Sequence, residues 1–526
     1  MTLLRHLVLT GSVLVLCATG ALAEVVLNRG NNGDPESLDP HKTSTIPEAN
    51  LMRDLFLGLT AHDGNATLIP GAAESWTVSE DGLVWTFHLR DGALWSDGSP
   101  VVAEDFVWSW QRVVNPETAA EYAYMLAPIL NAEAITAGEM PPSELGVKAL
   151  DPLTLQVTLK GPTPYFLEML THQATYPVNP ASVTALGADF TKAGKLVSNG
   201  PFVLESFTPN DHISVVKNDK FYDAANIAID RVNFYPTEDV ATATRRFEAG
   251  ELDMTLDFPA EQYEALKASL GDKVKVGPLL GTYYYGFKMD KEPWSNPEIR
   301  KAVSMAIDRD YLAEEVWQNT MLPAYTLVPP GIDGYEVAPP DYAAMTQLDR
   351  EDAAREILER YGYTEANPLK LEIRFNTNEN NANTAVALQE LLRPMGIEVT
   401  MINLDIAAHY AHLEAKGDFD LARAAWFADY KDPENFLSLC ITGAGNNYTL
   451  YSDATYDGLL GQAGVESDPA KRMGILAEAE EKGVVQDLCV MPLMFYSYRG
   501  LVSDKLQGWE PNVMDIHPSR FLSKTE

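Results

Sequence analysis

The stretch 423–433, Arg-Ala-Ala-Trp-Phe-Ala-Asp-Tyr-Lys-Asp-Pro, gathers groups that could bind a charged ligand. Its carboxylate Asp429 stands among aromatic residues, with Trp426 and Phe427 before it and Tyr430 after it. An ionised carboxylate only accepts hydrogen bonds, so it suits a cation that carries several N–H donors. The residues alone leave two interpretations of Asp429: it shapes the loop before a proline, or it holds a cation away from water.

The sequence offers little that indicates catalysis. It has no Gly-x-Ser-x-Gly motif, no His-Glu-x-x-His motif and no Gly-rich phosphate loop. His409 and His412 have helical spacing and could supply two metal ligands, but no third ligand stands nearby, which favours two exposed helix histidines. We therefore expect a binding protein with no metal and no cofactor, and we keep a secreted α/β hydrolase as a distant alternative.

The length and charge of the chain limit its class. A chain of 526 residues is too long for one hydrophobic core, so roughly two to four domains are expected. Acidic residues number 75 against 39 basic ones, which argues against nucleic acid or an anionic membrane as a partner.

Residues 1–23 are typical of a secretory signal peptide. Arg5 precedes a mostly apolar run, Leu7–Leu16, and the segment ends in the small-x-small pattern Ala21-Leu-Ala23. We predict cleavage near Ala23 and a periplasmic location. Lipid attachment at Cys17 is the alternative, and it is disfavoured because a leucine precedes that cysteine where a small residue is wanted.

Two cysteines follow the predicted signal peptide, Cys440 and Cys489. An even number of cysteines in an exported protein favours a disulfide, because the compartment permits oxidation. We predict one bridge between these two residues, with a pair of buried thiols as the alternative.

Helix and strand signals alternate along the chain. Alternating apolar residues predict a strand over 83–89, and a helix is predicted over 103–114. Thr237 is the expected N-cap of a helix over 238–247, followed by a strand over 252–256. Asn296-Pro-Glu298 predicts the start of another helix.

The segment 350–405 has the clearest pattern. A helical stripe ends at Gly362, and strand, helix and strand patterns follow over 369–375, 383–395 and 397–404. This order and spacing predict a βαβ crossover and hence a parallel sheet. Ligands of open α/β sheets bind outside the carboxyl ends of such strands.

Many short motifs resemble one family, and they occur in the same order. They are Ser37-Leu-Asp-Pro-His-Lys42, Arg53-Asp-Leu-Phe56, Ala73-Glu-Ser-Trp76, Trp85-Thr-Phe-His-Leu-Arg90, Trp95-Ser-Asp-Gly98, Glu104-Asp-Phe106, Ser109-Trp-Gln-Arg112, Leu145-Gly-Val-Lys148, Pro164-Tyr-Phe166, Asn199-Gly200, Gly250-Glu-Leu-Asp253, Thr282-Tyr-Tyr-Tyr285, Pro323-Ala-Tyr325 and Ala428-Asp-Tyr430. The sequence thereby resembles the periplasmic oligopeptide-binding proteins of the OppA type, solute-binding family 5 of peptide ABC transporters, over nearly the whole mature chain.

The resemblance implies a type II periplasmic binding protein fold of cluster C, an α/β fold with two closing lobes and three domains. Domain I is expected to combine 24–56, 180–280 and 498–526. Domain II, an extra lobe that enlarges the cavity, is expected over 57–179. Domain III is expected over 281–497. The lobes of such a fold close over the ligand by hinge motion.

The resemblance also assigns roles to residues. Asp429 is expected to pair with the α-ammonium of a bound peptide, and Arg423 is a candidate for its carboxylate, with an ion pair to Asp418 or Asp420 as the alternative. The backbone from Ala425 to Phe427 is expected to bind an extended peptide as an added strand does, opposite the segment from Ser44 to Ile46. The candidate cavity walls are Tyr122, Tyr283, Tyr284 and Trp426.

Some features of the family are absent. A lysine and a histidine that some members use for peptide carboxylates correspond to Trp317 and Asn381, so peptide length preference is expected to differ. Two family cysteines correspond to Gly281 and Phe427. The expected protein is a monomeric, non-catalytic receptor that delivers short peptides to an inner-membrane ABC permease. Murein peptides, dipeptides or a non-peptide solute remain alternative ligands.

Overall fold

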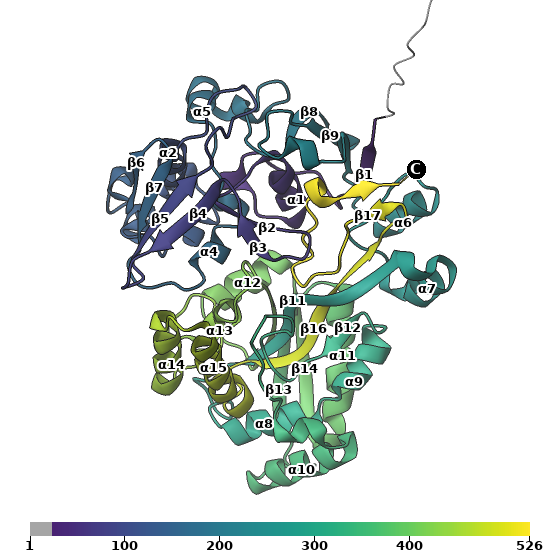
Figure 1. Cartoon of the computed structure of the whole chain (residues 1–526). Coiled ribbons are helices and arrows are strands. Elements are labelled where there is room, and N and C mark those ends of the chain that lie inside the picture. The colour runs from purple at the N-terminus through teal and green to yellow at the C-terminus, as the bar shows by residue number, and fades with distance from the viewer. Residues whose placement is uncertain (1–23, 526) are drawn as a thin grey trace, which may run out of the picture.

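The structure is a computed structural model that describes residues 24–525. The predicted signal peptide and Cys17 lie outside the described residues. Two lobes are arranged around separate sheets (Figure 1). No helix in the described part of the chain is long and apolar enough to cross a membrane.

The first lobe contains two four-stranded sheets. One has the order β1 (Val26–Gly30), β10 (Arg231–Tyr235), β9 (His212–Lys217), β8 (Phe202–Thr208), and β1 pairs with β10 in parallel. The other has the antiparallel order β4 (Ala73–Val78), β5 (Val84–Leu89), β7 (Thr154–Thr158), β6 (Val147–Asp151). One hydrophobic core joins both sheets with α1 (Ile46–Leu55) and α2 (Ala103–Val114).

The second lobe is built on one six-stranded sheet. Its order is β12 (Met321–Pro323), β16 (Met491–Leu501), β11 (Val274–Phe287), β15 (Leu421–Phe427), β13 (Leu369–Asn376), β14 (Ile397–Leu404). One core cluster includes residues of α8 (Pro297–Ala306), α10 (Gln347–Arg360) and α11 (Glu379–Leu392). Another includes residues of α13 (Glu434–Leu437), α14 (Ala454–Val465) and α15 (Pro469–Glu480).

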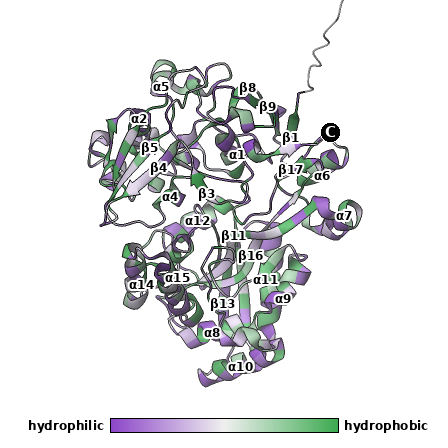
Figure 2. Cartoon of the chain, in the orientation of Figure 1, coloured by the Kyte–Doolittle hydropathy of each residue, from purple (hydrophilic) through white to green (hydrophobic). Residues whose placement is uncertain are grey.

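The remaining elements are shorter or lie at the edges. They are α3 (Ala132–Thr136), α4 (Phe166–Met169), α5 (Pro180–Leu186), α6 (Val240–Glu248), α7 (Tyr263–Leu270), α9 (Arg309–Tyr311), α12 (Ile406–Glu414), β2 (Thr60–His62), β3 (Leu68–Pro70), β17 (Leu506–Gln507) and β18 (Ser523–Lys524). Hydrophilic residues are interspersed along outer helices such as α7 and α10 (Figure 2).

The long strands β11 and β16 pair with each other and join the two lobes (Figure 1). Their antiparallel ladder is interrupted between Pro278 and Thr282, so Leu279, Leu280 and Gly281 leave the regular register. After β16 the chain returns to the first lobe, where the Lys524 ammonium donates to the carbonyl of Val26.

Several predicted elements are confirmed. Helix α2 has the predicted bounds, and α8 begins after its N-cap Asn296. Strands β13 and β14 pair in parallel around α11, which confirms the βαβ crossover.

Two local predictions are wrong. The N-cap of α6 is Asp239, whose carboxylate accepts from the amide of Thr242, whereas the Thr237 hydroxyl accepts from Arg246. The predicted strand over 252–256 is reduced to single bridges at Met254, because the neighbouring Asp253 carboxylate, instead of backbone, binds the amide of Asn28.

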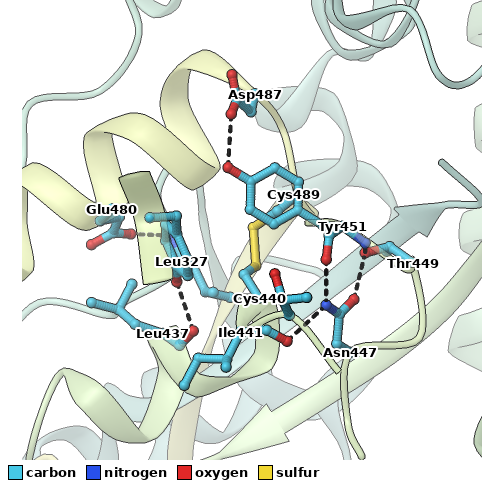
Figure 3. Close-up of a disulfide and its surroundings, with 12 residues drawn as sticks. Leu327, Leu437, Cys440, Ile441, Asn447, Thr449, Tyr451, Glu480, Asp487 and Cys489 are labelled. Carbon is cyan, nitrogen blue, oxygen red and sulfur yellow. Dashed lines mark hydrogen bonds between the residues drawn. A yellow bond between two sulfur atoms is a disulfide. The ribbon is translucent and has the colours of Figure 1, made fainter. Parts of the chain in front are cut away.

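The predicted disulfide between Cys440 and Cys489 is present, with the two Cα atoms 6.1 Å apart. It links the segment after α13 to the start of β16 (Figure 3). Both cysteines are fully buried. The bridge therefore anchors the segment after α13 to the residues that lead into β16.

Candidate ligand-binding cleft

Strand β15 carries the predicted site and has an incompletely paired edge. It pairs with β11 from Leu421 to Phe427, but β13 pairs only with its first two residues, Leu421 and Ala422. The two parallel strands diverge at their carboxyl ends. Among the described residues, no strand pairs with this edge from Arg423 onward.

The ladder fixes which backbone groups face that edge. The amide of Ala428 donates to the carbonyl of Leu280, and in an antiparallel pair alternate residues direct both polar groups to the same side. Ala425 and Phe427 therefore direct their N–H and C=O groups away from β11. The carbonyl of Arg423 faces the same way and bonds to the ring nitrogen of His409 at 2.8 Å.

Asp429 lies at a cavity of about 190 Å³ between the lobes. Ser44, Ile46, Tyr122 and Phe427, which sequence analysis assigned to the ligand, also line it. A second cavity of about 310 Å³ shares Ile46, Leu279, Phe427 and Asp515 with the first. The two cavities are thus adjoining parts of one cleft.

The Asp429 carboxylate is partly buried and makes no ion pair with any described residue. Its Oδ2 accepts a hydrogen bond of 2.9 Å from the hydroxyl of Tyr124, which comes from the first lobe. Burial raises the pKa of Asp429, and the hydrogen bonds from Tyr124 and Asn435 only partly oppose that shift. The site therefore holds a desolvated acid that an incoming cation would stabilise.

Asn435 and Trp426 hold the loop in place. The side-chain oxygen of Asn435 accepts from the amide of Asp429 at 3.2 Å and from the indole N–H of Trp426 at 2.8 Å. Trp426 therefore supports the loop from behind, and it does not line either cavity.

Arg423 is buried among polar groups and has no acidic partner in the described part of the chain. Its side chain is 8% exposed, donates to Asn376 and Tyr496 at 2.9 Å each, and lies over the ring of Tyr283. Burial acts to lower its pKa, but the surrounding tyrosine hydroxyls outweigh it, and the pKa lies above its usual value. The alternative ion pair is wrong, because Asp418 and Asp420 both bind Lys291.

The structure does not bring Tyr283 and Tyr284 to the cleft. They are 0% and 3% exposed, and they point into the two core clusters on opposite faces of the sheet. Successive residues of a strand face opposite sides, and helices cover both faces here. The interpretation of these rings as cavity walls fails for that reason.

The structure also gives the environments of residues that the sequence analysis misjudged or missed. His409 is buried by its bond to the Arg423 carbonyl, so it is not an exposed helix histidine. Trp317 and Asn381 are buried in the second lobe. Tyr124 reaches Asp429 across the lobes, and only its position two residues after Tyr122 hinted at a role.

Phe427, which the sequence analysis matched to a family cysteine, lines both cavities of the cleft. Its side chain is 46% exposed, packs at a tilt against the ring of Tyr496 and covers Gly281. A Cβ atom at 281 would lie 2.7 Å from that ring, so only glycine fits beneath it.

The sequence model of the bacterial extracellular solute-binding proteins, family 5 Middle, matches residues 67–448. The chain belongs to this family. This family 5 protein is 36% identical over 487 residues to the periplasmic oligopeptide-binding protein OppA of Salmonella typhimurium, which covers 92% of this chain and 89% of the relative.

Solved structures of family members confirm the predicted type II fold. The unliganded open form of the murein tripeptide-binding protein MppA has a TM-score of 0.86 and 34% identity, covering 96% of this chain and 98% of that one. Haemophilus influenzae OppA in complex with the peptide RPPGFSPFR has a TM-score of 0.78 and 34% identity, covering 96% and 99%.

Proposed function

We propose that this protein is a periplasmic receptor that captures short peptides in the cleft and delivers them to an ABC permease without catalysis. The observation that carries the proposal is Asp429, a partly buried carboxylate that faces an interlobe cavity and has no cationic partner among the described residues. The named peptide-binding relatives support the same ligand class.

The peptide's α-ammonium binds Asp429 in this proposal. Closing the lobes removes water from the pair, and removing one partner of a desolvated ion pair typically costs about 3–5 kcal/mol. That loss corresponds to roughly two to three decades of affinity or more. A free amino terminus is therefore the main requirement for binding.

The peptide backbone then extends along the open edge of β15. Ala425 and Phe427 offer N–H and C=O groups, as an edge strand does for an added strand. On the opposite wall, the amides of Ser44 and Thr45 already donate to the Glu48 carboxylate, so that segment offers carbonyl oxygens and the Ile46 side chain. Side chains of the peptide enter the adjoining cavities, where water adapts to their shapes.

The carboxylate end of the peptide is assigned to Arg423. Tyr496, whose hydroxyl accepts from Arg423, lines the second cavity and connects this guanidinium to the cleft. A guanidinium without an acidic partner is suited to a carboxylate.

The substitution Asp429→Asn tests the main contact, because the amide keeps the shape of the carboxylate and removes its charge. Calorimetry should show a loss of at least a hundredfold in affinity for peptides with a free amino terminus. N-acetylated peptides should bind the unmodified protein poorly. The matched control is Asp333→Asn, at a highly exposed acid, which should bind normally. Equal affinity for acetylated and free peptides would contradict the assignment.

A second candidate keeps the cleft and changes the cargo to murein peptides, and the close match to MppA favours it among the alternatives. Mass spectrometry of ligand that co-purifies from the periplasm separates the two. A linear peptide supports the first candidate, and a peptide containing cell-wall amino acids supports the second. A non-peptide solute would refute both. The same preparation tests cleavage near Ala23 and the monomeric state.

A further inference from the structure

Three arginines of the first lobe and the C-terminal segment lack acidic partners. Arg29 donates to the His517 carbonyl and the Ser519 hydroxyl, and Arg53 donates to Asn50 at 3.5 Å. Arg520 is only 8% exposed and lies over the rings of Phe521 and Phe221. No carboxylate is among these contacts in the described part of the chain.

Arg53 and Arg520 line one small cavity of about 20 Å³. Its other walls are mostly apolar, including Phe56 and Ile516, and no Asp or Glu lines it. The polar residues His62 and Tyr176, which also line the cavity, form hydrogen bonds with other residues. The ring of His62 bonds to Glu168 at 3.0 Å, and the hydroxyl of Tyr176 donates to the carbonyl of Thr171. The two guanidinium groups are therefore the main donors available to an occupant.

Among the described residues, none of the nearby acids forms an ion pair or a hydrogen bond with Arg53 or Arg520. Asp54 is fully buried and accepts from the amide of Ser519, while Asp515 bonds to the ring of His517. Glu168, which binds the cavity-lining ring of His62, is a third acid near the three arginines. Burial lowers the pKa of Arg53 and of Arg29, which reflects the cost of holding these charges away from water.

We propose that the cavity between Arg53 and Arg520 binds a monatomic monovalent anion, with chloride as the ligand. An anion there accepts hydrogen bonds from both guanidinium groups, which compensates buried charge. The size of the cavity decides the class, because about 20 Å³ holds one particle near the size of water. Sulfate and phosphate are too large for it.

The anion also acts as a link between segments that are distant in sequence. Arg53 belongs to α1, Arg520 to the C-terminal segment, and His62 to β2. A ligand that binds the folded state alone stabilises it in proportion to its concentration relative to its dissociation constant. Chloride should therefore stabilise this lobe beyond any general effect of salt.

Crystals of the mature protein soaked in sodium bromide give the direct test. The anomalous difference map should contain a bromide peak between the guanidinium groups of Arg53 and Arg520. A water molecule at that position without anomalous signal would overturn the proposal, as would bromide bound only at surface lysines.

Thermal unfolding supplies a second test in solution. At matched ionic strength, the melting temperature should be about 2 °C or more higher in sodium chloride than in sodium gluconate. Arg520→Gln should abolish this difference, and Arg520→Lys should keep part of it. The control Arg245→Gln, at an exposed arginine of the same lobe, should keep all of it. If Arg520→Gln retains the full difference, the assignment is wrong; if that variant fails to fold, the bromide map decides.

Discussion

Two acids of one loop, Asp432 and Asp429, have opposite environments. Asp432 is buried and forms two hydrogen bonds with the guanidinium of Arg472, at 2.6 and 2.8 Å. Among the described residues, Asp429, three residues earlier, bonds to a tyrosine hydroxyl and to no cation, and Arg423 on the preceding strand bonds to no acid. The comparison distinguishes the Asp432–Arg472 ion pair, which stabilises the loop, from Asp429 and Arg423, which we propose bind the ligand.

The largest effect is expected from Asp432→Asn, which leaves the Arg472 charge buried without its partner. Breaking a buried ion pair by removing one side costs about 3–5 kcal/mol of folding free energy. Chemical denaturation should show this loss, whereas Asp429→Asn should leave stability unchanged or raise it. A comparable loss in both variants would remove the distinction between the two acids.

A smaller effect is expected from Arg423→Gln on the binding of peptides with a free carboxylate. Hydrogen bonds to charged groups contribute about 1.5–3 kcal/mol, so affinity should fall roughly tenfold to a hundredfold. Peptides with an amidated carboxyl terminus serve as the control and should bind the variant and the unmodified protein alike. An equal loss for both peptides would show that Arg423 acts through the packing of β15 alone.

The pH dependence of binding follows from the raised pKa of Asp429. The ionised form binds the ammonium, so affinity is full above the raised pKa and falls by up to about tenfold for each pH unit below it. The decline should begin at a higher pH than an ordinary aspartate would give. In the unliganded protein the sign is reversed, because lowering the pH through this pKa removes a buried charge and adds stability. Calorimetry across pH should show a decline for the unmodified protein and none for Asp429→Asn.

The smallest effect is expected from Tyr124→Phe. The variant loses the hydrogen bond that stabilises the ionised Asp429, so the pKa of that acid should rise further. Peptide affinity near neutral pH should change by about tenfold or less. The informative measurement is the midpoint of the pH profile, which should move upward. An unchanged midpoint would indicate that the Tyr124 contact has no influence on the ionisation of Asp429.

Local patterns in the sequence predicted the parts of the fold that depend on neighbouring residues. The crossover of β13, α11 and β14 follows from hydrophobic periodicity and a glycine stop, and the Cys440–Cys489 bridge follows from a simple count. The single bridges at Met254 were not predictable, because a distant side-chain contact replaced the expected ladder. The exact domain boundaries stay a prediction.

The candidate site was only partly predictable for a related reason. Asp429, Phe427 and Ile46 line the cleft as expected. Three consecutive tyrosines in β11 give the same sequence pattern whether the strand is central in a sheet or lines a cavity. The helices that cover both faces of the sheet bury these rings, and the sequence pattern does not reveal that cover. Tyr124 and Asp515 join the site through contacts between lobes, which no local pattern records.

The peptide unit of Leu280, at the interruption of the β11–β16 ladder, connects the C-terminal segment to the loop that carries Asp429. Its amide donates to the carbonyl of Val513 in the C-terminal segment, and its own carbonyl accepts from Ala428, next to Asp429. Strands β11 and β16 run between the lobes, and Leu280 lies where their shared ladder is interrupted. One peptide unit therefore connects the C-terminal segment to the residue that precedes Asp429.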